Sequence, residues 1–239
     1  MYKGPLFNDG AGVLGGAVSF AAGNAPRSIA AADVDADGRL DLLTANTLSG
    51  NVTLFRGDGL GGFGAPEATA VGSTPRSVVM GDFNRDGRID FAVVNRQGNQ
   101  ARCYLNDGTG LFTLAGSQAV GELPWFVTAA DFDGDGVLDL ASANEGGRSV
   151  SVLRGLGDGT FEARVDLAVP NQTRAVAAAD LDGDGDADLA SAVFGAGVVS
   201  VLRNLRNGLA SCPGDVDGDG DVDFGDLNAL LGVFNAPCP

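Results

Sequence analysis

The sequence predicts an all-β protein, a β-propeller of four blades with about 49 residues each. First, Asp33, Asp82, Asp131 and Asp180 are spaced 49 residues apart without an insertion or a deletion. Second, short runs of Val, Ile, Leu and Ala alternate with turns rich in Gly, Asp and Asn. Third, glycine supplies 38 of the 239 residues, well above the usual share of about 7%.

Each repeat contains four apolar runs of strand length. In the first repeat these runs lie at residues 28–32, 40–45, 52–56 and 66–71. The first run consists mainly of small side chains, Ile29-Ala30-Ala31-Ala32, which fit the crowded strand next to the axis of a propeller. Four strands per period therefore predict one blade per repeat.

The two ends of the array leave the closure of the ring open. The chain begins in the middle of a repeat, and the fourth repeat stops after its third strand, at residues 199–203. The segment Ala17–Ala22 can supply the missing fourth strand, which would close a ring of four blades and hide its edge strands. The alternative is that the four units form part of a larger ring.

Acidic residues are concentrated in five short loops, which hold 22 of the 31 Asp and Glu residues of a chain with a net charge of −16. Four of these loops share the pattern Asp-x-(Asp/Asn)-x-Asp-Gly-x-x-Asp. Side-chain oxygens at positions 1, 3, 5 and 9, with the backbone carbonyl at position 7, are the candidate ligands of a metal ion. They are Asp33, Asp35, Asp37, Arg39 and Asp41; Asp82, Asn84, Asp86, Arg88 and Asp90; Asp131, Asp133, Asp135, Val137 and Asp139; and Asp180, Asp182, Asp184, Asp186 and Asp188.

Calcium is the cation that this pattern favours. Ca²⁺ binds about six to eight hard oxygens, whereas Mg²⁺ keeps several waters and needs fewer carboxylates. The Gly at position 6 permits the sharp turn that brings the ligands together. The alternative is a set of Asp/Gly-rich turns without a metal, but carboxylates packed so closely would repel one another without a cation. We expect about one Ca²⁺ per acidic loop, up to five in all.

The composition argues against several other functions. The chain contains no histidine, which excludes Ser-His-Asp triads and His-based zinc sites. It has no basic stripe to neutralise phosphates, so nucleic acid is not an expected partner. We find no catalytic constellation outside the acidic loops, and we expect a binding protein rather than an enzyme.

The repeats resemble FG-GAP/VCBS repeats of the type found in the propeller of integrin α-chains. The resemblance rests on Gly81-Asp82-Phe83-Asn84-Arg85-Asp86-Gly87, on Asp131-Phe132-Asp133-Gly134-Asp135-Gly136 and on Gly157-Asp158-Gly159-Thr160-Phe161. It implies a propeller domain over residues 1–205, with structural calcium in loops that join the first two strands of each blade and face away from most ligand sites. Members of this family serve adhesion, ligand binding or lectin-like recognition. They usually have seven blades, so four units are a departure.

Residues 206–239 break the period and form a second predicted domain. A twelve-residue loop, 215–226, is followed by Leu227-Asn228-Ala229-Leu230-Leu231-Gly232-Val233-Phe234, which has apolar residues at helical spacing. Loop and helix together are half of an EF-hand-like unit. The segment resembles a type I dockerin, which implies a possible cohesin-like partner, although only one loop is present. Its candidate calcium ligands are Asp215, Asp217, Asp219, Asp221, Asp223 and Asp226.

The cysteines and the flanking segments bear on the compartment. Cys212 and Cys238 bracket the last acidic loop, which favours a disulfide and an oxidising compartment; the alternative is a pair of free thiols. Cys103 stands where other repeats carry Leu or Val, so we expect a buried, unreactive thiol. No stretch is long and apolar enough to span a membrane, and the chain does not begin with a signal peptide. We expect a secreted or cell-surface protein.

A candidate ligand site lies at the opposite end of the blades from the acidic loops. Arg27, Arg76, Trp125 and Arg174 occupy one position of the repeat, at the start of the innermost strand. Arginine and tryptophan there suit an anionic group or the face of a sugar; the alternative is that these stems surround a solvent-filled channel mouth. We therefore expect an extracellular adhesion or ligand-binding module for a protein or glycan. The other hypothesis is a non-catalytic part of a secreted polysaccharide-degrading enzyme, docked through the dockerin-like tail.

Overall fold

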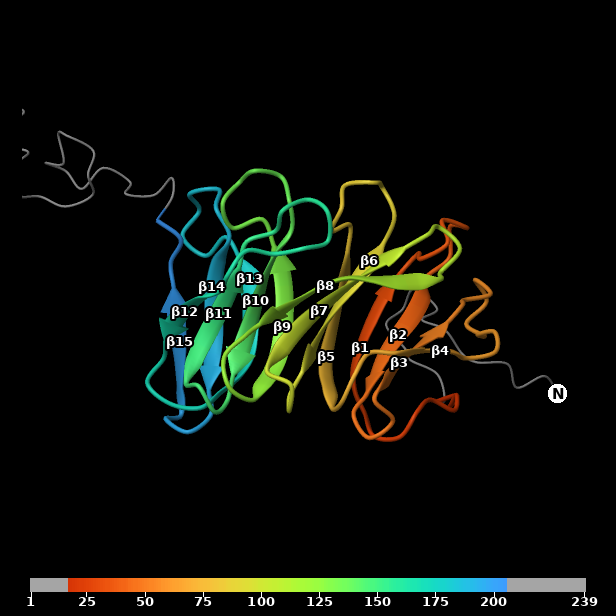
Figure 1. The fold of residues 1–239 in the computed structure, drawn as a ribbon, viewed down its shortest axis with the longest axis horizontal. Coiled ribbons are helices and arrows are strands. Elements are labelled where there is room, and N and C mark those ends of the chain that lie inside the picture. The colour runs from red at the N-terminus through yellow and green to blue at the C-terminus, as the bar shows by residue number, and fades with distance from the viewer. Residues whose placement is uncertain (1–16, 206–239) are drawn as a thin grey trace, which may run out of the picture.

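The computed structural model describes residues 17–205, and this part of the chain consists of fifteen β-strands and no helix. The strands form four antiparallel sheets, three with four strands and the last with three. In Figure 1 the sheets stand side by side, from the red and orange first sheet at one end of the view to the blue fourth sheet at the other. The all-β, four-bladed propeller predicted from the sequence is confirmed.

Each sheet is one blade, and its strands pair in the order in which they occur along the chain. The expected runs at 28–32, 40–45, 52–56 and 66–71 correspond to the four strands of blade 1. Blade 1 contains β1 (Pro26–Ala32), β2 (Asp41–Asn46), β3 (Asn51–Phe55) and β4 (Glu67–Ala70); blade 2 contains β5 (Pro75–Gly81), β6 (Asp90–Asn95), β7 (Gln100–Asn106) and β8 (Phe112–Ala119); blade 3 contains β9 (Pro124–Ala130), β10 (Asp139–Asn144), β11 (Ser149–Leu153) and β12 (Val165–Ala168); and blade 4 contains β13 (Thr173–Ala179), β14 (Asp188–Val193) and β15 (Val198–Leu202).

The first strand of every blade begins with a bulge. In β1 the register against β2 shifts between Pro26 and Ser28, so that the residue between them faces no partner. The same shift recurs in β5, β9 and β13. Proline has no N–H to donate to the hydrogen bonds between strands, so it is tolerated at the first position of a strand. The unpaired residues are the four candidate ligand-binding residues of the sequence analysis, and a bulge re-aims the side chain that it carries.

The hydrophobic core lies between the blades. In the first of three buried clusters, Val52 and Leu54 on one face of blade 1 pack with Val78 and Phe91 on the facing side of blade 2. The second and third clusters repeat this arrangement one and two periods later. Side chains alternate across a strand, so each blade offers one apolar face to the blade before it and another to the blade after it. Neighbouring blades thus stabilise one another.

The segment Ala17–Ala22 does not complete blade 4. It forms no strand, and it lies against blade 1, where the ring of Phe20 is 5.2 Å from that of Phe63 in an edge-to-face contact. The closure of a four-bladed ring by this segment, one of the two alternatives that the sequence left open, is therefore not found within the chain. The blades form an open row with the first and fourth at opposite ends (Figure 1).

Candidate functional site

The first Asp of each acidic loop folds the loop around its own carboxylate. Asp33 accepts hydrogen bonds from the backbone N–H groups of Asp37 and Gly38 at 3.1 and 2.8 Å. Asp82 accepts the equivalent two bonds, whereas Asp131 and Asp180 accept one from the Gly at position 6 and one from the Gly at position 4. Gly38 has φ +84°, which a glycine adopts without strain. The sequence pattern thus builds a similar tight turn four times, after the first strand of each blade, with the bond from the Gly at position 6 common to all four.

The last Asp of each loop is buried and connects the loop to its blade. Asp90 is 0% exposed, and its carboxylate accepts N–H bonds from Phe83 at 3.0 Å and from Asn106, the last residue of β7, at 2.8 Å. The equivalent residues Asp41, Asp139 and Asp188 make the same pair of bonds. Burial raises the pKa of Asp90 and of Asp139, although the backbone bonds lower it in part.

Three of the four loops gather carboxylate oxygens within reach of one ion. Within each group, one oxygen from each of three residues lies within 4.8 Å of the others. Two oxygens bound to the same Ca²⁺ at about 2.3–2.6 Å can be separated by up to about 5 Å. The groups are Asp33, Asp35 and Asp37; Asp131, Asp133 and Asp139; and Asp180, Asp182 and Asp188.

The grouping is looser than the predicted five-ligand cage. Asp41 is outside the first group, and Asp135 and Asp184 are outside the third and fourth. The second loop, with Asn84 at position 3, forms no such group among residues 17–205. The predicted ligands are therefore brought together in part. The acidic loops could hold metal ions at three places in the part of the chain that the structure describes.

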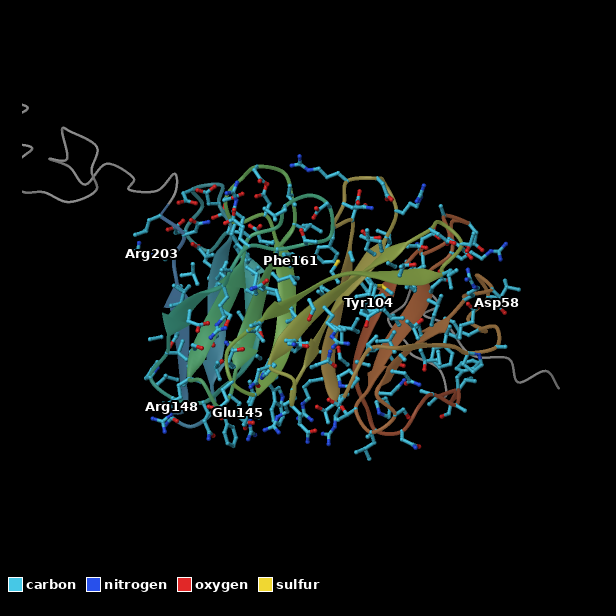
Figure 2. All side chains as sticks on the ribbon, in the orientation of Figure 1. Asp58, Tyr104, Glu145, Arg148, Phe161 and Arg203 are labelled. Atoms are coloured by element: carbon cyan, nitrogen blue, oxygen red, sulfur yellow. The ribbon has the colours of Figure 1, made fainter. Side chains whose placement is uncertain are left out.

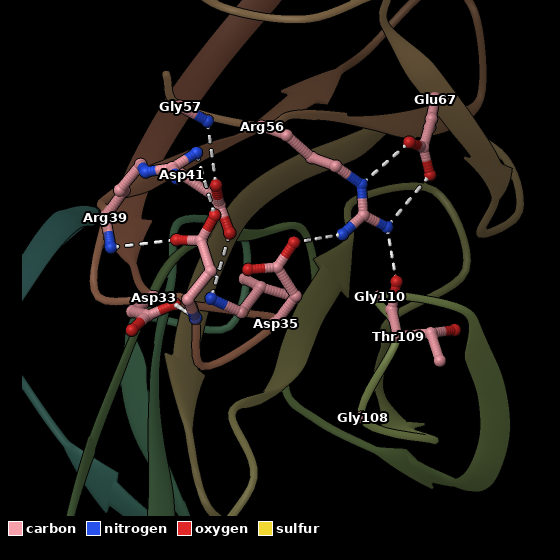
Figure 3. Close-up of polar contacts among 12 residues, drawn as sticks. Asp33, Asp35, Arg39, Asp41, Arg56, Gly57, Glu67, Gly108, Thr109 and Gly110 are labelled. Carbon is pink, nitrogen blue, oxygen red and sulfur yellow. Dashed lines mark hydrogen bonds and ion pairs between the residues drawn. The ribbon is translucent and has the colours of Figure 1, made fainter. Parts of the chain in front are cut away.

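The third residue of the loop has an arginine partner that the sequence analysis missed. In Figure 3, Arg56 lies between Asp35 and Glu67, with nitrogen–oxygen distances of 2.6 and 2.8 Å. Arg154 pairs with Asp133, and Arg203 with Asp182 at 4.0 Å, at the same repeat position. In blade 2 that position holds Leu105, and the loop residue is the neutral Asn84. The arginine and the carboxylate are thus replaced together in blade 2, and this paired replacement in the sequence could have predicted the ion pair.

The pairing with Arg56 leaves one oxygen of Asp35 for a metal. Arg56 holds Oδ2, whereas Oδ1 is buried and has no hydrogen-bond partner; Oδ2 of Asp184 is in the same situation. A buried carboxylate oxygen without a donor is unfavourable unless a cation neutralises it. Hard, negatively charged oxygens are the donors that Ca²⁺ prefers. The residues present therefore fit a divalent cation of this type.

At the other end of the blades, the four bulged residues come together at one pocket. A hollow of about 200 Å³ is lined by Arg27, Arg76, Trp125 and Arg174, with Ser28 and Phe126. The guanidinium carbon of Arg76 lies 3.5 Å from the centroid of the Trp125 ring, and that of Arg174 lies 4.5 Å from it. Burial lowers the pKa of Arg76, and nearby arginines, Arg27 first, lower it further. The predicted ligand site is therefore one cluster.

Two residues of this cluster were not assigned to it from the sequence. Glu145 is 6% exposed, and its carboxylate binds Arg96 at 2.6 Å and Arg174 at 2.5 Å. Arg96 also approaches Trp125, at 5.3 Å. Burial raises the pKa of Glu145, but the hydrogen bonds from Arg96 and Arg174 outweigh it and the net pKa is lowered. Arg96 and Glu145 are 49 residues apart, so opposite charges at one repeat position could have predicted the pair.

The acidic loops and the arginine cluster lie at opposite ends of the molecule. In Figure 2, Glu145 is labelled at the lower end, and Arg203, the partner of Asp182 in the fourth acidic loop, at the upper end. The loop follows the last residue of the innermost strand, whereas the cluster residues are at its start. This separation agrees with the expectation from the family resemblance.

Other predicted features are settled only in part. Cys103 is fully buried and free, and burial raises the pKa of its thiol. The Cys212–Cys238 disulfide and the dockerin-like segment lie outside the described residues. In residues 17–205 there is no helix long and apolar enough to cross a membrane.

Solved structures with a similar fold are distant in sequence. One is described as BBS1N in complex with ARL6DN; it is 13% identical, with a TM-score of 0.54, over 76% of this chain and 58% of that chain. A functionally unknown protein from Desulfotomaculum acetoxidans DSM 771 is 15% identical, with a TM-score of 0.51, over 74% and 55%. An Agrocybe aegerita lectin that recognises non-reducing terminal N-acetylglucosamine is 23% identical, with a TM-score of 0.49, over 82% and 53%.

The first two of these structures establish likeness of fold alone. The chain spans little more than half the length of each of the three. None of the curated proteins matches the chain.

The repeats match a known family model. The model of the FG-GAP-like repeat matches three overlapping segments, residues 33–93, 82–142 and 131–191. Each match begins at the first Asp of an acidic loop and extends into the following blade. Together they cover about two thirds of the chain. The chain belongs to the family of FG-GAP-like repeat proteins.

Proposed function

We propose that this chain is an extracellular, calcium-loaded ligand-binding or adhesion module, without catalytic activity of its own. Its acidic loops would hold Ca²⁺ at one end of the blades. Its arginine cluster would hold an anionic group of a protein or glycan ligand at the other end. The observation that carries the proposal is the cluster, in which three arginines and one tryptophan line a small pocket and a fourth arginine, Arg96, approaches the tryptophan ring.

The calcium part of the proposal rests on the chemistry of the loops. In residues 17–205, three of the four loops bring carboxylates together at the point where the chain turns from the first strand to the second. Binding of a cation removes the repulsion between them and fixes the turn. Because the buried Asp at position 9 ties each loop to the end of the third strand, an ordered loop also fixes the blade. We therefore assign Ca²⁺ a structural role.

The ligand part rests on uncompensated positive charge. In residues 17–205 Glu145 is the one carboxylate in ion-pair contact with Arg96 or Arg174, and none contacts Arg27 or Arg76. Four guanidinium groups thus face a single carboxylate, on a protein whose net charge is −16. Guanidinium groups bind carboxylate, sulfate or phosphate through paired hydrogen bonds.

The tryptophan narrows the choice between the two ligand chemistries expected from the sequence. A sugar face would stack on an open indole ring, but the guanidinium of Arg76 lies only 3.5 Å from the ring centroid of Trp125. The indole therefore holds the arginines in place by cation–π contact. This arrangement favours an anionic group, for example the carboxylate of an acidic saccharide, over stacking of a neutral sugar.

The test is a binding screen with acidic and neutral glycans in the presence of calcium. The chain should bind carboxylated or sulfated glycans, and Arg76→Ala combined with Trp125→Ala should abolish the signal. Arg148→Gln is the matched control, because Arg148 is exposed at the same end of the molecule but outside the pocket. Equal binding by the double variant and by the control, or binding of neutral glycans alone, would refute the assignment of the pocket.

The alternative, an accessory part of a secreted polysaccharide-degrading enzyme, depends on the dockerin-like segment at residues 206–239. That segment lies outside the described residues, and the geometry of the blades does not favour this alternative.

A further inference from the structure

The first and last blades each expose a face that is buried everywhere else in the array. Ile29 in β1 is 62% exposed, whereas Val78, Val127 and Val176 at the same repeat position are 5%, 2% and 3% exposed. The front face of blade 1 is thus the partly uncovered equivalent of faces that pack against the preceding blade: Ile29 is exposed, whereas Thr44 and Phe55 remain buried. We use "front face" for Ile29, Leu42, Thr44, Phe55 and Phe63, which line one hollow.

The opposite side of the array has the complementary exposure. Val199 in β15 is 68% exposed, whereas Val52, Ala101 and Val150 at the same repeat position are 1%, 2% and 0% exposed. Val201 is 53% exposed, whereas Leu54 and Cys103 are buried. We use "rear face" for Ala190, Ala192, Val199 and Val201, the blade 4 equivalents of the residues that pack against the next blade.

Front and rear faces are the two halves of one interface. Inside the chain, a rear face meets a front face three times, and each contact forms a hydrophobic cluster. The terminal faces carry the same kinds of side chain at the same repeat positions. Exposed apolar surface of this kind marks an interaction site.

Within residues 17–205, blade 4 has three strands, and the segment that could supply a fourth lies against blade 1. In the other blades a fourth strand pairs with the third, as β4 does with β3. In the described part of the chain β15 pairs with β14 alone, which leaves an unpaired edge. Residues 17–22 precede residues 66–71, which include β4, by one period of 49. They lie on the front face, where Val18 and Phe20 line the same hollow as Ile29.

We propose that two copies of this chain join head to tail, front face on rear face, and close a ring of eight blades. Each copy would place its residues 17–22 beside β15 of the other copy and supply the fourth strand of that blade. A head-to-tail contact closes when its rotation brings the second contact together, and eight blades are within the range known for propellers. A second copy fits these faces because its contact would repeat the interface that neighbouring blades form within one chain.

The test measures the mass of the full chain in calcium by light scattering and sedimentation equilibrium. The wild type should have about twice the monomer mass of 24.0 kDa. Ile29→Asp and Val199→Lys should each halve the mass, because each places a charge in both contacts of the ring. Both residues are exposed in the single chain, so neither change should alter the circular dichroism spectrum or the melting temperature of the monomer.

A mixture of the two variants provides the decisive control. One contact of the mixed pair would contain Asp and Lys facing each other, and the other would be wild type, so the mixture should recover the mass of a dimer. Leu48→Asp is the matched control, since Leu48 is 76% exposed and lies on neither face; it should remain dimeric. A wild type that stays monomeric would overturn the proposal, and the exposed faces would then bind something other than a second copy. Species that keep growing with concentration would overturn the closed ring.

Discussion

Replacing Asp90 by Ala tests the clamp that joins each acidic loop to its blade. The carboxylate accepts two backbone hydrogen bonds, from Phe83 and Asn106, and all three residues are at most 2% exposed. Removing it leaves two buried donors unsatisfied, at about 1–3 kcal/mol each. Burial also disfavours the charged carboxylate of Asp90 itself, so removing that carboxylate relieves part of the cost. We therefore expect a loss of about 2–4 kcal/mol in the free energy of unfolding.

The assay is equilibrium denaturant unfolding in EDTA, where metal binding cannot contribute to the result. Asp86→Ala is the matched control in the same loop. Its side chain is 29% exposed, and its one backbone donor, Arg88, lies in an exposed loop, so water can replace it. The control should lose less than about 1 kcal/mol. Equal losses in the two variants would show that the two buried hydrogen bonds of Asp90 stabilise the fold no more than the exposed bond of Asp86, and that the clamp reasoning is wrong.

Three further predictions follow from the site. Asn84→Asp should raise the calcium affinity of the second loop by roughly tenfold, because it restores the carboxylate of the other loops; calorimetric titration of the variant against the wild type measures it. Glu145→Gln should change the pH dependence of stability: the lowered pKa of Glu145 means that its stabilisation is present above the unfolded pKa of about 4.3 and is lost as the pH falls through the lower folded value. Denaturant unfolding between about pH 5 and pH 3 should therefore show the difference between wild type and variant shrinking towards acid, and a difference that grows would contradict the assignment. Cys103 should resist a thiol reagent in the folded protein and react after unfolding, as mapped by mass spectrometry; labelling of the native protein would contradict its burial.

Much of the fold could be predicted because the repeat multiplies a weak local signal. A single run such as Ser28–Ala32 is ambiguous between strand and helix. Because the run recurs four times at a period of 49 residues, the repeat predicts the strands, the turns between them and the blade that they form. The acidic loops were predictable for the same reason. Their carboxylate positions depend on the local chain geometry, which the Gly at position 6 and the Asp at position 1 determine.

Contacts between blades were harder to predict. The partners of Arg56 and Glu145 come from different turns or different blades, and the sequence indicates them only through paired changes at one repeat position. Asp139 and Asp188 each accept backbone hydrogen bonds that hold the loop to its blade, and each also belongs to an acidic group. The sequence pattern predicted the second role but not the first, because the first depends on the burial of the carboxylate. Ala17–Ala22 could pair with the edge of blade 4 or pack on blade 1, and the repeat pattern predicts the first, whereas the structure shows the second.

Calcium binding is the central claim, and one measurement tests it most directly. The full chain, freed of metal, is titrated with Ca²⁺ by calorimetry and then melted in Ca²⁺ and in EDTA. We predict uptake of several ions and a stabilisation of about 2.7 kcal/mol per site at a hundredfold excess over Kd, or about 5–10 °C per site. Uptake should fall by one ion when Asp33, Asp35 and Asp37 are all replaced by Asn. No uptake, with the same melting temperature in calcium and in chelator, would contradict the account.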